Sequence, residues 1–108
     1  MKEPKRINIE GDHVTVEWGC TKLGRLGGAY KAGDYLRGKI RVSHGMTLRS
    51  KQAVLLHEEL HDLWKRAGLD VTVPERYEEI VIDGLASWLL VFIRQNPDVL
   101  RFLQQEEM

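Results

Sequence analysis

The chain has 108 residues, enough for one domain built around one modest hydrophobic core. Its 16 Lys and Arg residues balance 16 Asp and Glu residues, and no basic stripe stands out, which disfavours nucleic acid as a partner. Cys20 is the single cysteine, so no disulfide can form within the chain.

The apolar stretches are short. The charged N-terminus is not followed by an apolar run of signal-peptide length. The longest apolar stretch, Leu85 to Ile93, is interrupted by Ser87 and is far shorter than the roughly 20 residues of a membrane span. We therefore expect a soluble, cytoplasmic protein that has no membrane partner.

The first 45 residues have the pattern of strands and turns. Residues His13 to Trp18 alternate between apolar and polar side chains, which is typical of a half-buried strand. A Gly-rich loop is predicted next, at Gly24, Gly27 and Gly28. Gly28 to Lys31 and Lys39 to Ser43 are then predicted as two strands of an antiparallel hairpin, joined around Gly33-Asp34 and Gly38.

The second half has the pattern of helices. Thr47 is a plausible N-cap for a helix from about Leu48 to Ala67, with Gly68 at its C-terminal end. Asp70 to Pro74 is predicted as a connecting loop. A second long helix is predicted from Pro74 or Glu75 to Arg94, because apolar residues recur at helical spacing: Ile80, Val81, Leu85, Leu89 and Phe92.

Asn96 and Pro97 mark the boundary between that helix and a short last one, because Asn is a good N-cap and Pro suits the first helical position. Its buried stripe would be Val99, Leu100, Phe102 and Leu103. The pattern predicts one α+β domain over residues 1–108, with a small antiparallel sheet against two long helices and a short C-terminal helix.

Residues 57 to 61 read H-E-x-x-H. On a helix, His57 and His61 lie on one face and can ligate one metal ion through their ring nitrogens. Glu58 would border the metal and take a proton from its water, as the general base. With 4 histidines in 108 residues, the motif is expected by chance about 0.01 times. The alternative is a solvated helix face that carries two surface histidines.

Zinc needs a third protein ligand and leaves the fourth position to water. Glu79 and Asp83 share one face of the second long helix, and Ala86 and Leu90 continue this inward-looking stripe. Glu79 is the predicted ligand, with Glu78 as the alternative. Asp83 would accept a hydrogen bond from the second ring nitrogen of a ligand histidine, His57 in particular. In a third interpretation, both glutamates only favour the helix dipole and Asp83 is solvated.

Other polar and aromatic residues have competing interpretations. Tyr77 is a candidate to stabilise an oxyanion, or a half-buried helix aromatic. The strand Lys39 to Ser43 could pair with an extended substrate at the edge of the sheet. The remaining residues are predicted to be structural: His13 and His44 at the surface, and Trp18, Trp64 and Trp88 in the core.

H-E-x-x-H, followed by Glu79 and Asp83, resembles the gluzincin-type metallopeptidases. More specifically, the chain resembles the small phage-type proteins of the ImmA/IrrE-like metallopeptidase family. The matching stretches cover roughly residues 13 to 95: Gly28 to Val42, Val54 to His61 and Glu79 to Ala86. Two positions differ from the family pattern. Glu59-Leu60 stands where Leu-Gly is common, and Ile82-Asp83 where Ala-Asn is typical.

The resemblance implies a three-stranded sheet before the active-site helix and zinc-dependent hydrolysis of a peptide bond in a protein or peptide substrate, often a repressor-type partner. It implies His57, His61 and Glu79 as zinc ligands and Glu58 as the catalytic base. Two rival functions remain from the residues themselves. One is a non-proteolytic interaction module stabilised by zinc. The other is a metal-free interaction protein that uses the apolar segment Leu85 to Ile93.

Overall fold

A computed structural model describes residues 2–21, 23, 25–26, 29–30, 32–36 and 38–107. Strands β1 (Arg6–Ile9), β2 (Asp12–Cys20), β5 (Gly33–Leu36) and β6 (Lys39–Ser43) form one sheet in the order β1-β2-β6-β5. The dipeptides β3 (Arg25–Leu26) and β4 (Ala29–Tyr30) pair separately. The predicted Gly-rich loop at Gly24, Gly27 and Gly28 lies outside the described residues, as do two ends of the predicted strand, Gly28 and Lys31.

The sheet is mixed and has four strands, so the predicted three-stranded antiparallel sheet was wrong. β2 pairs with β1 antiparallel but with β6 parallel, and β5 pairs with β6 antiparallel. The hairpin partner of β6 is β5, so Gly33 and Asp34 lie in a strand instead of a turn. Alternation of side chains identifies a strand, but it does not specify the direction or the partner of its pairing.

The core lies between the sheet and the first long helix. Alternate residues of two central strands are buried there: Val14 and Val16 of β2, and Ile40 and Val42 of β6. The predicted alternation of His13 to Trp18 is confirmed, because β2 covers that segment. β6 lies between two strands, so the predicted edge position of Lys39 to Ser43 was wrong and β5 forms the edge instead.

The helices begin and end close to their predicted boundaries. In α1 (Leu48–Arg66), the Thr47 hydroxyl accepts a hydrogen bond from the backbone N–H of Ser50 at 3.2 Å. Gly68 follows with a φ of 76°, a left-handed conformation that glycine adopts without strain. The predicted loop from Asp70 to Pro74 was wrong in part, since residues Leu69–Thr72 form the short helix α2.

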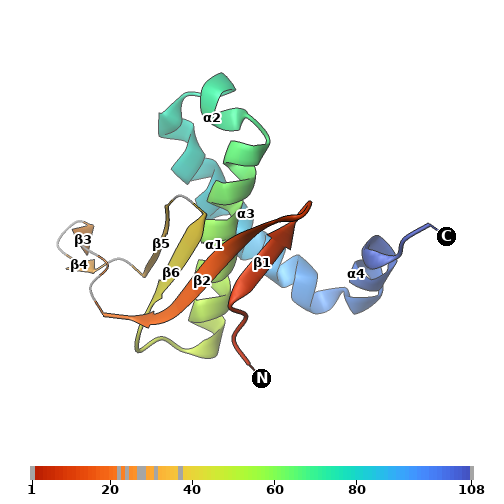
Figure 1. Cartoon of the computed structure of the whole chain (residues 1–108), viewed down its shortest axis with the longest axis horizontal. Coiled ribbons are helices and arrows are strands. Elements are labelled where there is room, and N and C mark those ends of the chain that lie inside the picture. The colour runs from red at the N-terminus through yellow and green to blue at the C-terminus, as the bar shows by residue number, and fades with distance from the viewer. Residues whose placement is uncertain are drawn as a thin grey trace.

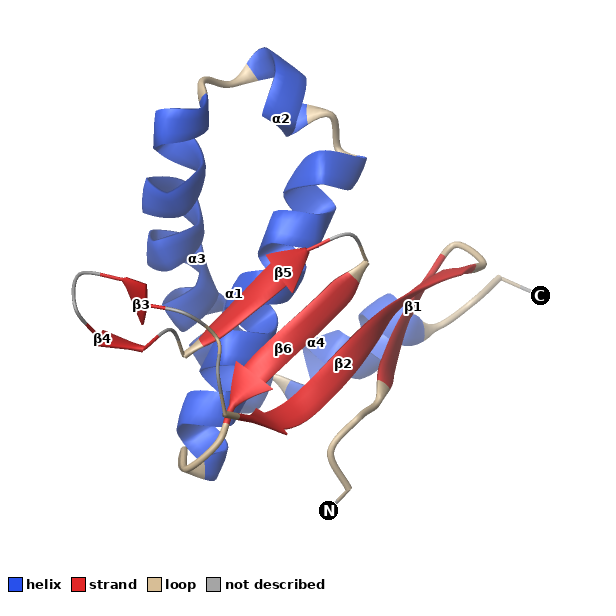
Figure 2. Cartoon of the chain, turned by 60° about the vertical axis from the view of Figure 1, so that its left-hand side comes forward, coloured by secondary structure: helices blue, strands red, loops and turns tan. Residues whose placement is uncertain are grey.

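The two remaining helices are α3 (Glu75–Gln95) and α4 (Pro97–Gln104). The side chain of Asn96 donates a hydrogen bond back to the carbonyl of Phe92 and does not cap α4. Helix α1 lies between the sheet and α3, while α4 projects away from both (Figures 1 and 2). None of the helices in the described part of the chain is both long and apolar enough to cross a membrane.

The inward face of α3 contains two apolar residues of the predicted stripe. Ala86 and Leu90 are buried, as is Ile82, and these three residues, one turn apart, pack toward α1. Most of the apolar residues whose spacing predicted this helix are exposed, as are Trp88 and most of the stripe predicted for α4: Ile80, Val81, Leu85, Phe92, Val99, Phe102 and Leu103. Helix α3 is apolar on two faces, so periodicity alone could not identify the one that faces α1.

Candidate metal centre

His57 and His61 lie one turn apart on the face of α1 that meets α3. Their ring centroids are 5.1 Å apart, and their side chains are about one-fifth exposed. The spacing of four residues brings both imidazoles to the same side of the helix, as the sequence predicted. They open into a cleft of about 820 Å³ whose walls come from α1, α2, α3 and the edge strand β5.

Glu79 of α3 faces both imidazoles. One carboxylate oxygen lies 2.8 Å from Nε2 of His57, and the other lies 3.0 Å from Nε2 of His61. The two nitrogens that an H-E-x-x-H helix offers to a metal therefore converge on one carboxylate from a neighbouring helix. The structure brings together the three residues that the sequence predicted as ligands.

The outer nitrogens of both rings also contact carboxylates. Nδ1 of His57 lies 3.3 Å from Asp83, and Nδ1 of His61 lies 2.5 Å from Glu78. The geometry thus brings Asp83 to the histidine for which it was predicted. It places Glu78, the alternative ligand, behind His61 instead of between the Nε2 atoms. Sequence reasoning had not assigned Glu78 this position, which depends on the rotation of α3 about its axis.

The contacts around the two rings also suit a bound cation. A neutral imidazole carries one N–H, so a ring that donates from Nδ1 leaves a lone pair on Nε2. Such a lone pair cannot bond to the oxygens of Glu79, which are acceptors when ionised. A divalent cation at this point would accept both lone pairs and the Glu79 carboxylate, and it would offset the negative charge of the neighbouring acids.

Glu58 lines the same cleft and is only 8% exposed. One of its oxygens lies within 4.8 Å of ligand nitrogens of both His57 and His61. Burial raises the pKa of Glu58, the two imidazoles oppose that rise, and the Glu79 and Asp34 carboxylates add to it. A carboxylate beside two candidate metal ligands, with its pKa raised, suits the predicted role of general base.

Gly33 allows the edge strand β5 to approach Glu58 closely. A Cβ at this position would overlap Cγ1 of Val54, and it would lie 2.9 Å from the carbonyl oxygen of Arg41 and 3.6 Å from Cγ of Glu58. The absence of a side chain at residue 33 therefore sets the distance between the strand and the helix that carries the motif.

We expect Gly33→Ala to lower the free energy of unfolding by about 1–3 kcal/mol, because the strand and the helix must separate. Urea denaturation measures this change. Any hydrolytic activity should fall on the order of 100-fold, since a displacement of about 1 Å can misplace reacting groups. Unchanged stability and unchanged activity would show that the contact is looser than the structure indicates.

A second cluster of acids lies on the side of α1 that faces the sheet. Asp62 is 1% exposed and accepts hydrogen bonds from the Tyr35 hydroxyl at 2.9 Å and from Nε of Arg66 at 2.8 Å. Both carboxylate oxygens of Glu59 are buried, with no hydrogen-bond partner among the described residues. Burial and the neighbouring Asp62 carboxylate raise the pKa of Glu59 to about 8.

Because the folded protein favours the protonated form of Glu59, this group should make stability depend on pH. The contribution of Glu59 to the free energy of unfolding is complete below pH 4.5, which is the pKa of this group in the unfolded chain. It is lost as the pH rises toward 8, the pKa in the folded protein, at up to about 1.4 kcal/mol per pH unit. Glu59→Gln should remove this dependence. The difference in the free energy of unfolding between variant and wild type, measured by urea denaturation in the presence of a chelator, should increase from pH 5 to pH 8. A difference that stays constant would contradict the raised pKa.

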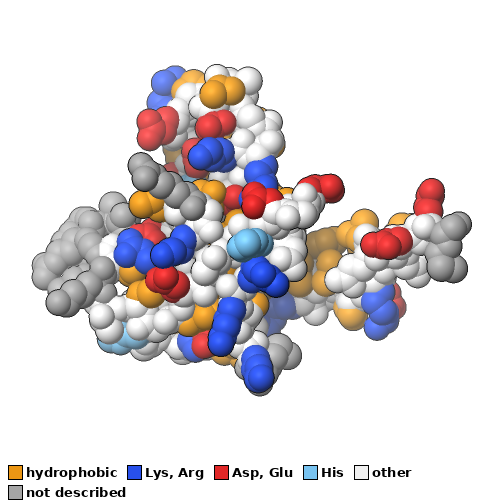
Figure 3. Space-filling view, in the orientation of Figure 1, with side chains coloured by type: hydrophobic (Ala, Val, Ile, Leu, Met, Phe, Trp, Pro, Cys, Tyr) orange, Lys and Arg blue, Asp and Glu red, His pale blue; other side chains and the backbone are white. Residues whose placement is uncertain are grey.

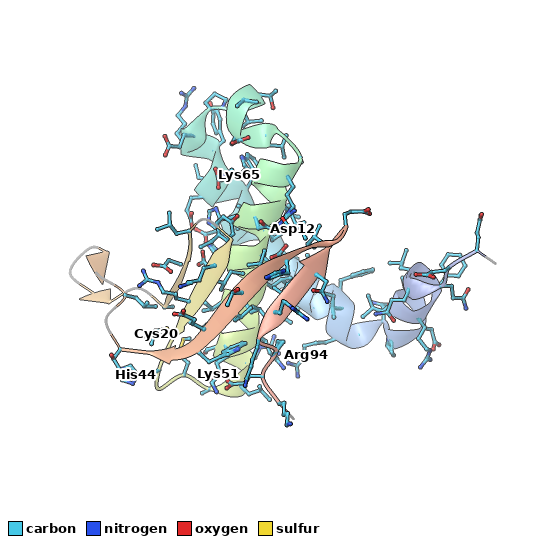
Figure 4. All side chains as sticks on the ribbon, in the orientation of Figure 1. Asp12, Cys20, His44, Lys51, Lys65 and Arg94 are labelled. Carbon is cyan, nitrogen blue, oxygen red and sulfur yellow. The ribbon has the colours of Figure 1, made fainter. Side chains whose placement is uncertain are left out.

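The remaining candidates lie outside the cleft. Tyr77 is on the outer side of α3, where its ring lies under the guanidinium of Arg76 and its hydroxyl accepts a hydrogen bond from that group at 3.2 Å. The structure therefore does not bring Tyr77 to the site as an oxyanion stabiliser. His13 and His44 are exposed, as predicted, and His44 lies at the opposite end of the fold from Lys65 of the cleft (Figure 4).

Comparisons of the chain with protein-family models, with curated proteins and with solved structures found no match, so these comparisons assign it to no family.

Proposed function

We propose that this chain is a zinc-dependent hydrolase that cleaves peptide bonds and is related to the ImmA/IrrE-like metallopeptidases. The observation that carries the proposal is the convergence of two imidazole Nε2 atoms on the Glu79 carboxylate, with Glu58 beside them in an open cleft. The motif comes from one helix and the third donor from another, which is the arrangement that the resemblance implies.

The donor set favours zinc among the common metals. Two imidazoles and one carboxylate are the ligands of many catalytic zinc sites, and they leave one position for water. Hard cations such as Ca²⁺ and Mg²⁺ prefer oxygen ligands only. Glu78 lies within hydrogen-bond distance of Nδ1 of His61, and Asp83 lies 3.3 Å from Nδ1 of His57. Donation of the Nδ1 protons to these two carboxylates would hold each Nε2 lone pair toward the metal.

A zinc ion bound here would act as a Lewis acid and lower the pKa of its water to about 7. Glu58 would accept a proton from that water and pass it to the leaving amine. An extended substrate would align with β5, which is the edge strand of the sheet and lines the cleft through Gly33, Asp34 and Tyr35. The unpaired side of an edge strand offers backbone hydrogen bonds to a peptide of almost any sequence.

The test combines metal analysis with a hydrolysis assay. Purified protein should contain about one zinc ion per chain and should cleave an unfolded protein such as casein. A chelator should abolish the cleavage, and added zinc should restore it. Protein that holds well under one zinc ion per chain after incubation with excess zinc would refute the proposal.

A second candidate is a non-proteolytic module in which zinc only supports the fold. It is favoured by the small apolar contact of α3 with α1, in which only Ile82, Ala86 and Leu90 of α3 are buried. A metal held by both helices would strengthen that junction. This candidate predicts a large fall in melting temperature when zinc is removed, with no cleavage of any substrate by the zinc-loaded protein.

A further inference from the structure

The outward side of α3 carries a second apolar face, opposite to the one packed on α1. Its six large side chains are 39% to 74% exposed and, apart from the adjacent pair Ile80 and Val81, are three or four residues apart: Tyr77, Ile80, Val81, Leu85, Trp88 and Phe92. Helix α4, which follows α3 directly, also exposes apolar residues: Val99, Phe102 and Leu103. Figure 3 shows apolar side chains (orange) on the projecting part of the molecule that contains α4.

The exposed area is large for a single chain in water. Four of the nine residues are aromatic, and an aromatic side chain has about 150–250 Å² of surface. At the exposed fractions given above, the nine side chains together expose on the order of 1,000 Å². The largest apolar patch of an ordinary monomer covers about 300–600 Å². A standard interface buries roughly 800 Å² on each partner. The face is therefore large enough to form a stable interface.

Among the described residues, little covers helix α4. It has only 8 residues, and it packs mainly against the end of α3. A helix of this length is marginal in water unless its apolar side is buried. Only Asn96 connects the end of α3 to the start of α4, whereas two antiparallel helices are joined by about 2–5 residues, so α4 cannot fold back onto the outward face of its own α3.

Gly84 lies on the outward face, within one residue of the midpoint of α3. A glycine inside a helix costs about 0.5–1 kcal/mol relative to alanine, and a Cβ at Gly84 would meet no atom of the described residues within 4 Å. The packing of the chain therefore does not explain the glycine. A close approach by another helix at this point would explain the glycine, because two helices can approach closely where one of them has no side chain.

We propose that the outward face of α3, continued by α4, is the interface of a symmetric dimer of this chain. A small residue near the middle of α3, with large apolar residues on both sides, suits two antiparallel copies that cross at Gly84 about a two-fold axis. This arrangement opposes the two helix dipoles favourably. Two copies also carry no net repulsion, since 16 basic residues balance 16 acidic ones.

The proposed crossing of the two α3 helices also determines where each α4 lies in the dimer. Because the two α3 helices run antiparallel, α4 of one copy leaves its α3 beside the first turns of the other α3. Near those turns α2 exposes Val71, which is 83% exposed in the single chain. The same contact would therefore cover part of the apolar stripe of α4 and an apolar side chain of α2.

Sedimentation equilibrium of the full chain tests the proposal. Wild type should have twice the chain mass of 12.5 kDa in the micromolar range. Trp88→Glu should weaken association more than about 30-fold, because a buried tryptophan is a common interface hot spot. Leu36→Glu is the matched control, since Leu36 is a 64% exposed apolar residue on β5, away from this face, and should leave the dimer intact.

Gly84→Gln separates the interface from the fold. The added side chain has free space in the monomer and improves helix propensity, so the variant should fold at least as stably as wild type. It should nevertheless be monomeric, because the side chain blocks the crossing. A monomeric wild type at several hundred micromolar would overturn the proposal and leave the face to a different protein. A Gly84→Gln dimer as tight as wild type would also overturn it.

Cross-linking tests the symmetry directly. In a Cys20→Ser background, Gly84→Cys places a thiol near the proposed two-fold axis, so mild oxidation should join two chains through this residue. Leu36→Cys in the same background should remain a single chain. Equal cross-linking of the two variants would show that the dimer axis does not pass near residue 84.

Discussion

Glu58→Gln should lower the rate of peptide hydrolysis by about 10²–10⁴-fold while the zinc content stays near one ion per chain. Glutamine keeps the size of the side chain but cannot accept a proton from water. Glu58 lies beside the two imidazoles, but Glu79 is the carboxylate that contacts both Nε2 atoms, so metal binding should survive the loss of the Glu58 charge. Rates on casein and metal content, measured on the same preparation, give the two values.

Glu59→Gln is the matched control for this experiment. Glu59 is the next residue on α1, has the same exposed fraction of 8%, and is not among the residues that line the cleft. Its replacement changes a buried glutamate in the same way but should leave the hydrolysis rate within a few-fold of wild type. If both variants were equally impaired, Glu58 would have a structural role, and the assignment of the catalytic base would fail.

Replacing Glu79 by Gln should weaken zinc binding on the order of 10²–10³-fold, because the site would lose its third ligand, which is the one that carries a charge. The same change at Glu78 should weaken binding only about 10–100-fold, since Glu78 contacts the outer nitrogen of His61 and would orient the ring. Competition with a chromophoric chelator measures both affinities at one pH. The informative quantity is the ratio of the zinc affinities of the two variants.

Asp83→Asn completes the comparison. Asp83 contacts Nδ1 of His57, so its effect should resemble that of Glu78→Gln and stay smaller than that of Glu79→Gln. If Glu78→Gln proved the most damaging of the three, Glu78 would be the third ligand. The helix α3 of the zinc-bound protein would then have to be rotated relative to this structure.

Local sequence signals predicted the elements that carry the site. The hydroxyl of Thr47 and the left-handed Gly68 mark the two ends of α1, and both features could be predicted because they depend on a few neighbouring residues. Inside that helix, a spacing of four residues determines that His57 and His61 share one side. The alternation in β2 and the start of α3 after Pro74 have equally local causes.

The direction and order of the strands could not be predicted in this way. The alternation of Ile40 and Val42 shows that β6 buries one face, but it is the same for parallel and antiparallel neighbours. The prediction therefore missed the parallel pairing of β6 with β2 and placed β6 at the edge. Strand β1 was not predicted at all, because its four residues Arg6–Ile9 contain only two apolar side chains.

The sequence by itself determined which residues share a helix face: the two imidazoles on α1, and the acids Glu79 and Asp83 on α3. Only the tertiary structure decided that Glu79 meets the Nε2 atoms while Glu78 lies behind His61. The reason is geometric. Adjacent helical residues point about 100° apart, so the rotation of α3 about its axis selects between them. That rotation depends on which of its two apolar faces packs against α1, a choice that local periodicity leaves open.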